Sequence, residues 1–320
     1  MRVHRSYRGL PPEARGAVVA IGNFDGVHRG HRAVVGAAGE RAARLGARLG
    51  VVTFEPHPRE VLTPEAAPAR LTPLRAKALL LGRLGVAELF VLPFTAALMR
   101  KSPEAFVGEV LVAGLGARHV VVGDDFRFGH RRAGDVALLE TLGFRHGFGV
   151  TGMAPVAWRG ETCSSSRIRE ALAAGEVADA AELLGHPHAV EGRVVRGDGR
   201  GRTLGFPTAN VRPGHPRALL PATGIYAVRA GLVRRGGDGP AWLDGAASLG
   251  WNPTFEAREL RLEVHLFDFV GDLYGQRLCV TFVARLRGER RFDDVDDLRR
   301  QIEQDCRRAR DLLAGADRWS

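Results

Sequence analysis

The chain has 320 residues, 45% of them hydrophobic and 26% charged, and this ordinary globular composition excludes a disordered protein. Domains run to roughly 100–200 residues each, so the length predicts two of them. No stretch approaches the roughly 18 consecutive apolar residues of a membrane span, and we expect no membrane partner.

The chain is basic, since 46 Lys and Arg against 36 Asp and Glu give a net charge of +10. Only Lys77 and Lys101 are lysines, and the arginines are spread along the chain without forming blocks. A nucleic-acid-binding protein is one alternative, and it would bind RNA or DNA with strong salt dependence. Phosphorylated ligands explain the charge equally well, and we expect no nucleic acid partner.

Two features of the sequence favour a compartment inside the cell. The N-terminal residues lack the apolar run of a secretory signal, so we expect a cytoplasmic protein. Cys163, Cys279 and Cys306 are odd in number and far apart, which fits neither a disulfide framework nor a metal site.

The first half of the chain alternates strand-like and helix-like segments, which predicts an α/β domain with a parallel sheet and helices on both faces. Thr72-Pro73 and Ser102-Pro103 each place a capping hydroxyl before a proline, so helices should begin at both. Buried strands are expected over residues 17–21, 49–54, 89–92 and 119–122, with a helix over 31–45.

The pattern changes near residue 185. Two short helices, over 168–174 and 178–184, should end at Gly185, because the proline two residues later cannot continue a helix. We therefore expect domains over 1–185 and 186–320.

The second domain should be a small antiparallel β-barrel followed by a terminal helix. Apolar residues at helical spacing follow Asp293 and Asp294, which are capping candidates, so this helix should pack on the barrel. Strands are expected over residues 189–195, 224–229, 260–269 and 278–286.

A glycine-rich segment over residues 22–31 lies between the first strand and the first helix, where α/β sheets bind nucleotides. His28 and His31 can face one phosphate from a tight turn and stabilise charge on a phosphorus during in-line displacement. A zinc pair and two surface histidines are the alternatives. Zinc is disfavoured because no third ligand follows at helical spacing.

A second glycine-rich and basic segment, over residues 197–210, lacks the Gly-Lys-Ser/Thr ending of a Walker A loop. Downstream, residues 260–266 alternate strictly between leucine or valine and polar residues. Glu263 therefore faces away from the apolar layer. It is either a solvent-facing charge or a carboxylate that accepts a hydroxyl proton.

Residues 22–31 resemble the HxGH signature of nucleotidylyltransferases, in the form found in bacterial FAD synthetases. Residues 123–129 and 164–169 are similar to that family's second motif and its serine and arginine motif. The resemblance implies a Rossmann-like nucleotidylyltransferase fold. It also implies catalytic roles for His28, His31 and Arg167, ATP or phosphate binding by Gly22, Phe24, Gly30, Ser164 and Ser165, and flavin binding by Asp125, Phe126 and Phe128.

Residues 206–210, Phe-Pro-Thr-Ala-Asn, resemble the PTAN motif of riboflavin kinases. By this resemblance Thr208 and Asn210 bind Mg²⁺ and phosphate, Gly199 and Gly205 belong to the ATP-binding loop, and Glu263 is the catalytic base. One departure is Asn252, where many relatives carry arginine.

Together these segments resemble the bifunctional prokaryotic riboflavin kinase/FMN adenylyltransferase family from about residue 16 to residue 313. The family implies two reactions, riboflavin plus ATP to FMN, then FMN plus ATP to FAD and pyrophosphate, both with Mg²⁺ as cofactor. We expect a monomer or weak homo-oligomer. An enzyme with one active half, or one altered to accept a flavin analogue, remains open because of Asn252.

Overall fold

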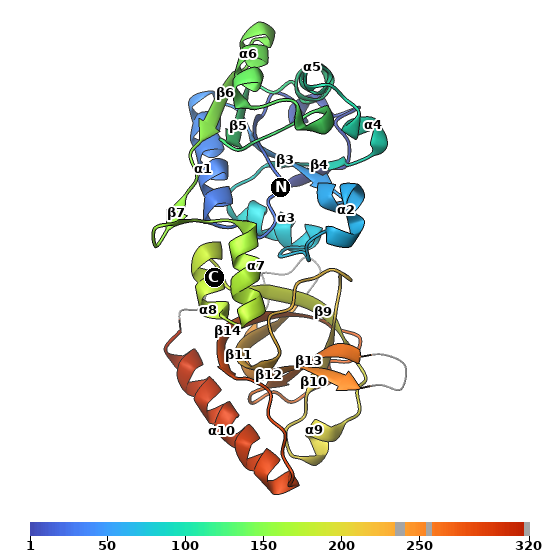
Figure 1. The fold of residues 1–320 in the computed structure, drawn as a ribbon, viewed down its shortest axis with the longest axis vertical. Helices are drawn as coiled ribbons and strands as arrows, with labels where there is room; N and C mark the ends of the chain where they lie inside the picture. Colours follow the sequence, from blue (N-terminus) through green and yellow to red (C-terminus); the bar gives the residue numbers. More distant parts are fainter. Residues whose placement is uncertain (234–240, 254–257, 317–320) are drawn as a thin grey trace. The chain divides into compact units, whose positions relative to one another are not determined.

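The structure, a computed structural model, describes residues 1–233, 241–253 and 258–316 (Figure 1). The chain forms two compact units, Met1–Ser164 and Ser165–Ser320, and each is described by itself. This division falls earlier than residue 185. The domain boundary expected there remains a prediction about function.

The first unit is built on a six-stranded sheet in which every neighbouring pair is parallel, as predicted. Val18–Ile21 lies centrally, with the next strand along the chain on one side and a later strand on the other. In spatial order the strands are β1 (Arg2–His4), β4 (Glu88–Pro93), β3 (Leu49–Glu55), β2 (Val18–Ile21), β5 (His119–Gly123) and β6 (Gly149–Met153).

Helices cover both faces of this sheet, which confirms the predicted layers. Val19 and its alternates pack in one core cluster with the π-helical segment η3 (Phe106–Leu115) and α6 (Val136–His146). Val18 and its alternates pack in a second cluster with α1 (Arg29–Arg44) and α3 (Leu74–Arg83). The strands are buried on both faces, so they are apolar without alternation.

Shorter elements complete the unit at the ends of the sheet. They are α2 (Pro58–Leu62), α4 (Ala96–Met99), α5 (Pro103–Ala105), the single-turn segments η1 (Pro12–Ala14), η2 (Pro64–Ala66) and η4 (His130–Arg132), and the hairpin of β7 (Ala157–Trp158) and β8 (Glu161–Thr162).

One of the two predicted helix caps is wrong. The Ser102 hydroxyl accepts a hydrogen bond from the backbone N–H of Ala105, 3.1 Å away, and so caps α5 as expected. Pro73 occupies the cap position of α3 without a side-chain bond. The Thr72 hydroxyl instead accepts from the backbone N–H of Gly26 at 2.8 Å, because a loop distant in sequence lies against it.

The second unit contains a closed antiparallel barrel, as predicted. The strand expected over 260–269 ends earlier, because Asp268 has a left-handed φ of 56° in the turn that follows. Around the barrel the strands are β10 (Ala209–Pro213), β13 (Arg258–Leu266), β12 (Trp242–Pro253), β11 (Gly224–Leu232), β14 (Arg277–Arg287) and β9 (Ala189–Val195).

Helices precede and follow the barrel (Figure 1). α7 (Ser165–Ala174) and α8 (Val177–Leu184) come first, and Gly185 ends α8 in the left-handed conformation, with φ 73°, as predicted. The terminal helix α10 (Val295–Ala314) begins where the Asp294 carboxylate accepts from the N–H of Asp296 at 3.0 Å.

The helix α10 packs on the barrel through Ala309 and Leu313, which are buried against strand residues such as Ala227. The buried Arg229 donates to the carbonyl oxygens of Leu313 and Ala316, at 2.8 and 3.0 Å. A cation at these last carbonyls also complements the helix dipole.

Candidate functional sites

The first candidate site is the loop between β2 and α1. Strand β2 lies between β3, the next strand along the chain, and the later strand β5. The order of strands in the sheet therefore changes direction at β2. Crevices beyond the carboxyl ends of parallel strands at such a point bind ligands. The glycine-rich segment therefore lies where a nucleotide is expected to bind.

His28 and His31 lie together, as predicted. His28 caps α1, because its Nδ1 accepts from the backbone N–H of His31 at 3.3 Å. The two rings stack with centroids 3.6 Å apart and planes 19° from parallel. A Cβ at Gly30 would lie 3.2 Å from the His28 ring, so the close approach of ring and helix favours glycine there.

The surroundings of His31 disfavour the charged form of its imidazole. Burial lowers its pKa well below the usual value of 6.5, and the neighbouring His28 and Lys77 lower it further. Its Nδ1 is buried and has no hydrogen-bond partner in the described part of the chain. An uncharged imidazole carries one ring N–H, so the ring of His31 can still donate one hydrogen bond.

The loop before His28 has a strained backbone. Phe24 and Val27 have left-handed φ values of 49° and 43°, conformations that cost about 1–3 kcal/mol for such residues. The buried carboxylate of Asp25 accepts from the backbone N–H groups of Leu71 and Thr72, at 3.2 and 2.9 Å. The segment before α3 thus holds this loop in its shape.

Gly22 and Phe24, both expected to bind ATP, differ in where they lie: one follows the strand β2 and the other is buried in the core. Gly22 directly follows β2, and its backbone N–H donates to the carbonyl of Val52 at 3.1 Å. Phe24 is only 1% exposed and meets His31 edge to face at 5.2 Å. Its side chain supports the histidine pair from the core, which leaves its backbone to contact a ligand.

A cluster of buried charges under this loop was not predicted. Arg70, 2% exposed, pairs with Glu55 at 2.7 Å and Glu60 at 2.6 Å. Burial, with the nearby Arg70, lowers the pKa of His57 to about 4. Lys77 is fully buried, and burial lowers its pKa to about 8. The chain has only two lysines, and Lys77 stands among the apolar residues of α3. This position could have indicated a buried lysine from the sequence.

The residues expected at the flavin follow β5. Asp125 is exposed in the turn, while Phe126 and Phe128 stack with centroids 5.6 Å apart and planes 14° from parallel. Phe128 is buried in a core cluster, and Phe126 is half-buried against it. Of the two rings, Phe126 is the less buried.

The serine and arginine motif opens a helix, as predicted. Ser164 directly precedes α7, and Ser165 and Arg167 lie in its first turn, half-buried. Ser164 ends the first compact unit and Ser165 begins the second. A contact of Arg167 with the nucleotide of the histidine pair remains a prediction.

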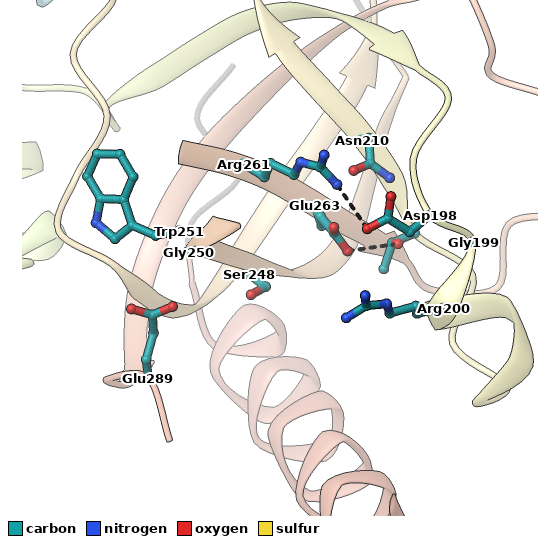
Figure 2. A pocket seen from close by; sticks show the side chains of 11 residues that line it. Asp198, Gly199, Arg200, Asn210, Ser248, Gly250, Trp251, Arg261, Glu263 and Glu289 are labelled. Carbon is teal, nitrogen blue, oxygen red and sulfur yellow. Dashed lines mark hydrogen bonds and ion pairs between the residues drawn. The ribbon is translucent and has the colours of Figure 1, made fainter. Parts of the chain in front are cut away.

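The second candidate site is a cavity of about 230 Å³ in the barrel (Figure 2). Glu263 on β13 pairs in register with Asn210 on β10 and with Ser248 on β12, so three strands supply its wall. The lining residues are Asp198, Gly199, Arg200, Thr208, Asn210, Ser248, Gly250, Trp251, Arg261, Glu263 and Glu289.

All the predicted kinase residues except Gly205 line this cavity. The Thr208 hydroxyl donates to Oε2 of Glu263 at 3.3 Å, and Arg261 pairs with Asp198 at 3.2 Å. Figure 2 shows Glu263, Asn210 and Asp198 at one end of the cavity. Leu262 and Val264 are buried on the opposite face of β13, which confirms the predicted alternation.

The glycines of the preceding loop let the chain approach these side chains. A Cβ at Gly197 would lie 2.3 Å from the Asn210 amide nitrogen, and one at Gly201 would lie 2.4 Å from the Phe206 carbonyl oxygen. Gly199 lines the cavity with φ 73°. Gly205, with φ 89°, ends the short helix α9 (Arg200–Thr203) and is not among the residues that line this cavity.

The donor set of the cavity suits a hard cation. A threonine hydroxyl, an asparagine amide oxygen and carboxylates are the ligands that Mg²⁺ prefers, usually in combination with substrate phosphates. Within residues 1–233, 241–253 and 258–316 no group of three His, Cys, Asp or Glu could hold a metal alone. The residues of the cavity therefore fit a metal that arrives with a nucleotide.

Several lining residues were not predicted. Arg261 lies on the same face of β13 as Glu263, so the strand alternation could have found it. Trp251 and Glu289 lie at the other end of the cavity (Figure 2), where only the folded barrel places them. The resemblance to riboflavin kinases continues past Asn252 into Thr254 and Phe255, and these two residues lie outside the described part of the chain.

Comparisons with known proteins place the two parts of the chain in two enzyme families. A family model described as FAD synthetase matches residues 10–167, and one described as riboflavin kinase matches residues 184–313. A solved structure of a Streptococcus pneumoniae protein described as a macrolide-efflux protein is 30% identical, with a TM-score of 0.86 over 99% of each chain. No described helix is long and apolar enough to cross a bilayer.

Curated relatives cover nearly the whole chain. A bifunctional riboflavin kinase/FMN adenylyltransferase of Pseudomonas fluorescens is 44% identical over 98% of each chain. The protein of the same description in Escherichia coli K12 is 42% identical over 93% of each chain. The chain belongs to the family of bifunctional riboflavin kinase/FMN adenylyltransferases.

Proposed function

We propose that the barrel cavity phosphorylates riboflavin with Glu263 as the base. The observation that carries this is the 3.3 Å hydrogen bond between Thr208 and Glu263 inside a cavity that also exposes Asn210. Glu263 accepts the proton of the ribityl 5′-hydroxyl as that oxygen attacks the γ-phosphorus of ATP. The bond to the β-phosphate oxygen breaks and ADP leaves.

The phosphate of ATP lies along the glycine-rich loop in this proposal. Gly199 and Arg200 line the cavity beside Thr208, and the guanidinium can bind phosphate oxygens through two parallel hydrogen bonds. Gly205 shapes the turn that returns the chain to β10. Thr208 and Asn210 would hold Mg²⁺ together with the nucleotide, and the bound ion would supply positive charge at the transferred phosphoryl group.

We propose that the loop between β2 and α1 transfers AMP to FMN. A phosphate oxygen of FMN attacks the α-phosphorus of ATP, and the bond to the β-phosphate breaks, so that FAD and pyrophosphate form. His28 and His31, stacked 3.6 Å apart, donate to the oxygens on which charge develops. Gly22 and Gly30 let the backbone approach the phosphates.

The remaining predicted residues complete this second reaction. Ser164, Ser165 and Arg167 bind the polyphosphate, and Asp125 and Phe126 bind the flavin, with Phe128 as their support. Mg²⁺ accompanies this ATP as well. The functional domains are residues 1–185 and 186–320.

The proposed partners are riboflavin, FMN, FAD, ATP and pyrophosphate. Nucleic acid and membrane are not partners in this proposal. The enzyme is cytoplasmic and a monomer or weak homo-oligomer.

Separate inactivation of the two sites tests these assignments. Glu263→Ala should abolish FMN formation from riboflavin while FAD formation from supplied FMN persists. His28→Ala combined with His31→Ala should do the reverse. The purified variants are mixed with ATP, Mg²⁺ and either flavin, and the products are separated by chromatography.

Loss of both reactions in either variant, with the fold intact by circular dichroism, would contradict two separate sites. Full FAD formation by the histidine double variant would show that adenylyl transfer takes place elsewhere.

A further inference from the structure

Lys77 in α3 is a fully buried cation, and neither of the two proposed reactions uses it. Its side chain is 0% exposed, and within the described residues no carboxylate pairs with it. Removing a charged group from water without an ion-pair partner is unfavourable. Its hydrogen bonds must therefore offset the cost of burying the charge.

The ammonium of Lys77 is directed at the strained loop. Its Nζ donates to the backbone carbonyl of Asn23 at 2.6 Å and lies 3.4 Å from the hydroxyl of Thr53. Thr53, also fully buried, donates to the same carbonyl at 3.1 Å. Two side chains from different elements therefore converge on one backbone oxygen, immediately before the left-handed residue Phe24.

This anchor complements the one on the other side of Phe24. Asp25 binds the segment before α3 through the N–H groups of Leu71 and Thr72, and Lys77 in α3 binds Asn23. The loop is thus held on both sides of Phe24, by α3 and by the segment that precedes α3. The loop then leads directly to the histidine pair.

We propose that Lys77 is a positioning residue for adenylyl transfer: its buried ammonium holds the loop over residues 23–27 in the conformation that stacks His28 on His31. The inference rests on the proposed role of these histidines. Lys77 does not contact the nucleotide in this proposal and acts through the loop and through its charge.

The charge gives the proposal a second consequence. Lys77 is one of the groups that lower the pKa of His31, after burial and His28. Loss of this cation should raise the pKa of His31. The groups that act on Lys77 itself, besides its burial, are Asp25, Glu55, Arg70 and Glu60.

Lys77→Met in the full-length protein tests the proposal, because methionine keeps the unbranched stem and removes the charge. We expect FAD formation from supplied FMN to lose about 10- to 100-fold in kcat/KM, as for a small misplacement of catalytic groups. The acid side of its pH profile should move to higher pH. Riboflavin phosphorylation by the same preparation should be unchanged.

Lys101→Met is the matched control, because Lys101 is the other lysine of the chain and pairs with Glu109. It should behave like the unmodified protein. Thr53→Val removes the second donor to Asn23 with little change of shape, and should reduce the same kcat/KM about two- to tenfold. This variant decides the matter if Lys77→Met does not fold.

Values within twofold of the unmodified protein for both Lys77→Met and Thr53→Val would overturn the proposal. So would an equal fall in stability and activity with an unmoved pH profile, which indicates a structural role alone. If both variants behave like the unmodified protein while the histidine double variant is inactive, only this inference is overturned. FAD formation by that double variant overturns the proposed site as well.

Discussion

At the scale of single residues, Glu263 offers the sharpest test of the kinase reaction. Glu263→Gln keeps the size and the hydrogen bond to Thr208 but cannot accept a proton. We expect kcat for riboflavin phosphorylation to fall about 100- to 10,000-fold, the usual contribution of a general base, with KM for riboflavin little changed. Steady-state kinetics with riboflavin and ATP measure both.

Glu289→Gln is the control for this substitution, because Glu289 lines the same cavity at its other end. It removes a similar charge without touching the proposed base. A comparable loss of kcat in Glu289→Gln would mean that the charge of the cavity matters and that proton transfer to Glu263 does not.

His57 links stability to pH. Its pKa is about 4 in the folded protein and 6.5 when unfolded, so between these values the unfolded chain binds a proton that the folded chain does not. Stability should therefore fall as the pH drops from 6.5 toward 4 and should be unaffected by this group above 6.5. Thermal unfolding at several pH values measures the slope.

His57→Asn should reduce that slope, because asparagine can still accept from the N–H of Arg59, as the Nδ1 of His57 does at 3.1 Å, but cannot be protonated. His146→Asn, at an exposed position on α6, should leave the slope as it is. An unchanged slope in His57→Asn would show that other groups account for the acid sensitivity.

At the scale of elements, the loop before β10 depends on a close backbone approach. Gly201→Ala would place a Cβ 2.4 Å from the Phe206 carbonyl oxygen and 3.1 Å from the Thr208 hydroxyl. We expect a loss of about 1–3 kcal/mol in stability and at least tenfold in kinase kcat/KM, with FAD formation from FMN retained. Calorimetry and the two activity assays measure these effects.

Gly288→Ala is the corresponding control, since its Cβ would meet nothing closer than Arg285 Nη2 at 3.8 Å. It should leave kinase activity within twofold of the unmodified protein. Normal kinase activity in Gly201→Ala would indicate that the loop shifts freely without disturbing Thr208.

The sequence predicted elements well where one segment carries its own signal. The strand β9 and the end of α8 at Gly185 were found because apolar runs and a glycine followed by proline are local. β12 was missed, because its alanines, glycines and serine resemble a loop until β11 and β13 pair with it. Thr72 was assigned to the wrong partner, since Gly26 approaches it from 46 positions away.

In the two candidate sites as well, local patterns were predictable and contacts between distant segments were not. His28, His31, Thr208 and Glu263 were predicted because they belong to motifs or alternate strictly along a strand. The cluster of Arg70, Glu55 and Glu60 depends on contacts between β3, α2 and the segment before α3, which no pattern of spacing reveals. Phe24 was expected at the ligand, whereas burial assigns its ring to the core.

At the scale of the whole molecule, the packing boundary and the proposed functional boundary differ. A chain of residues 1–185 should form FAD from FMN, whereas one of residues 1–164 should not, because it lacks Ser165 and Arg167. Both shortened chains are expressed, checked by circular dichroism and assayed. FAD formation by residues 1–164 at the full rate would exclude Arg167 from the reaction.

The helices α7 and α8 pack with the barrel, where the N–H of Ala222 donates to the carbonyl of Leu172 and Arg285 donates to that of Ala174. The proposed functional boundary at residue 185 nevertheless assigns α7, with its Arg167, to the first domain. Splitting the gene at either boundary would damage one product or the other. Under these assignments both domains need the helix α7, which favours keeping the two enzymes on a single polypeptide.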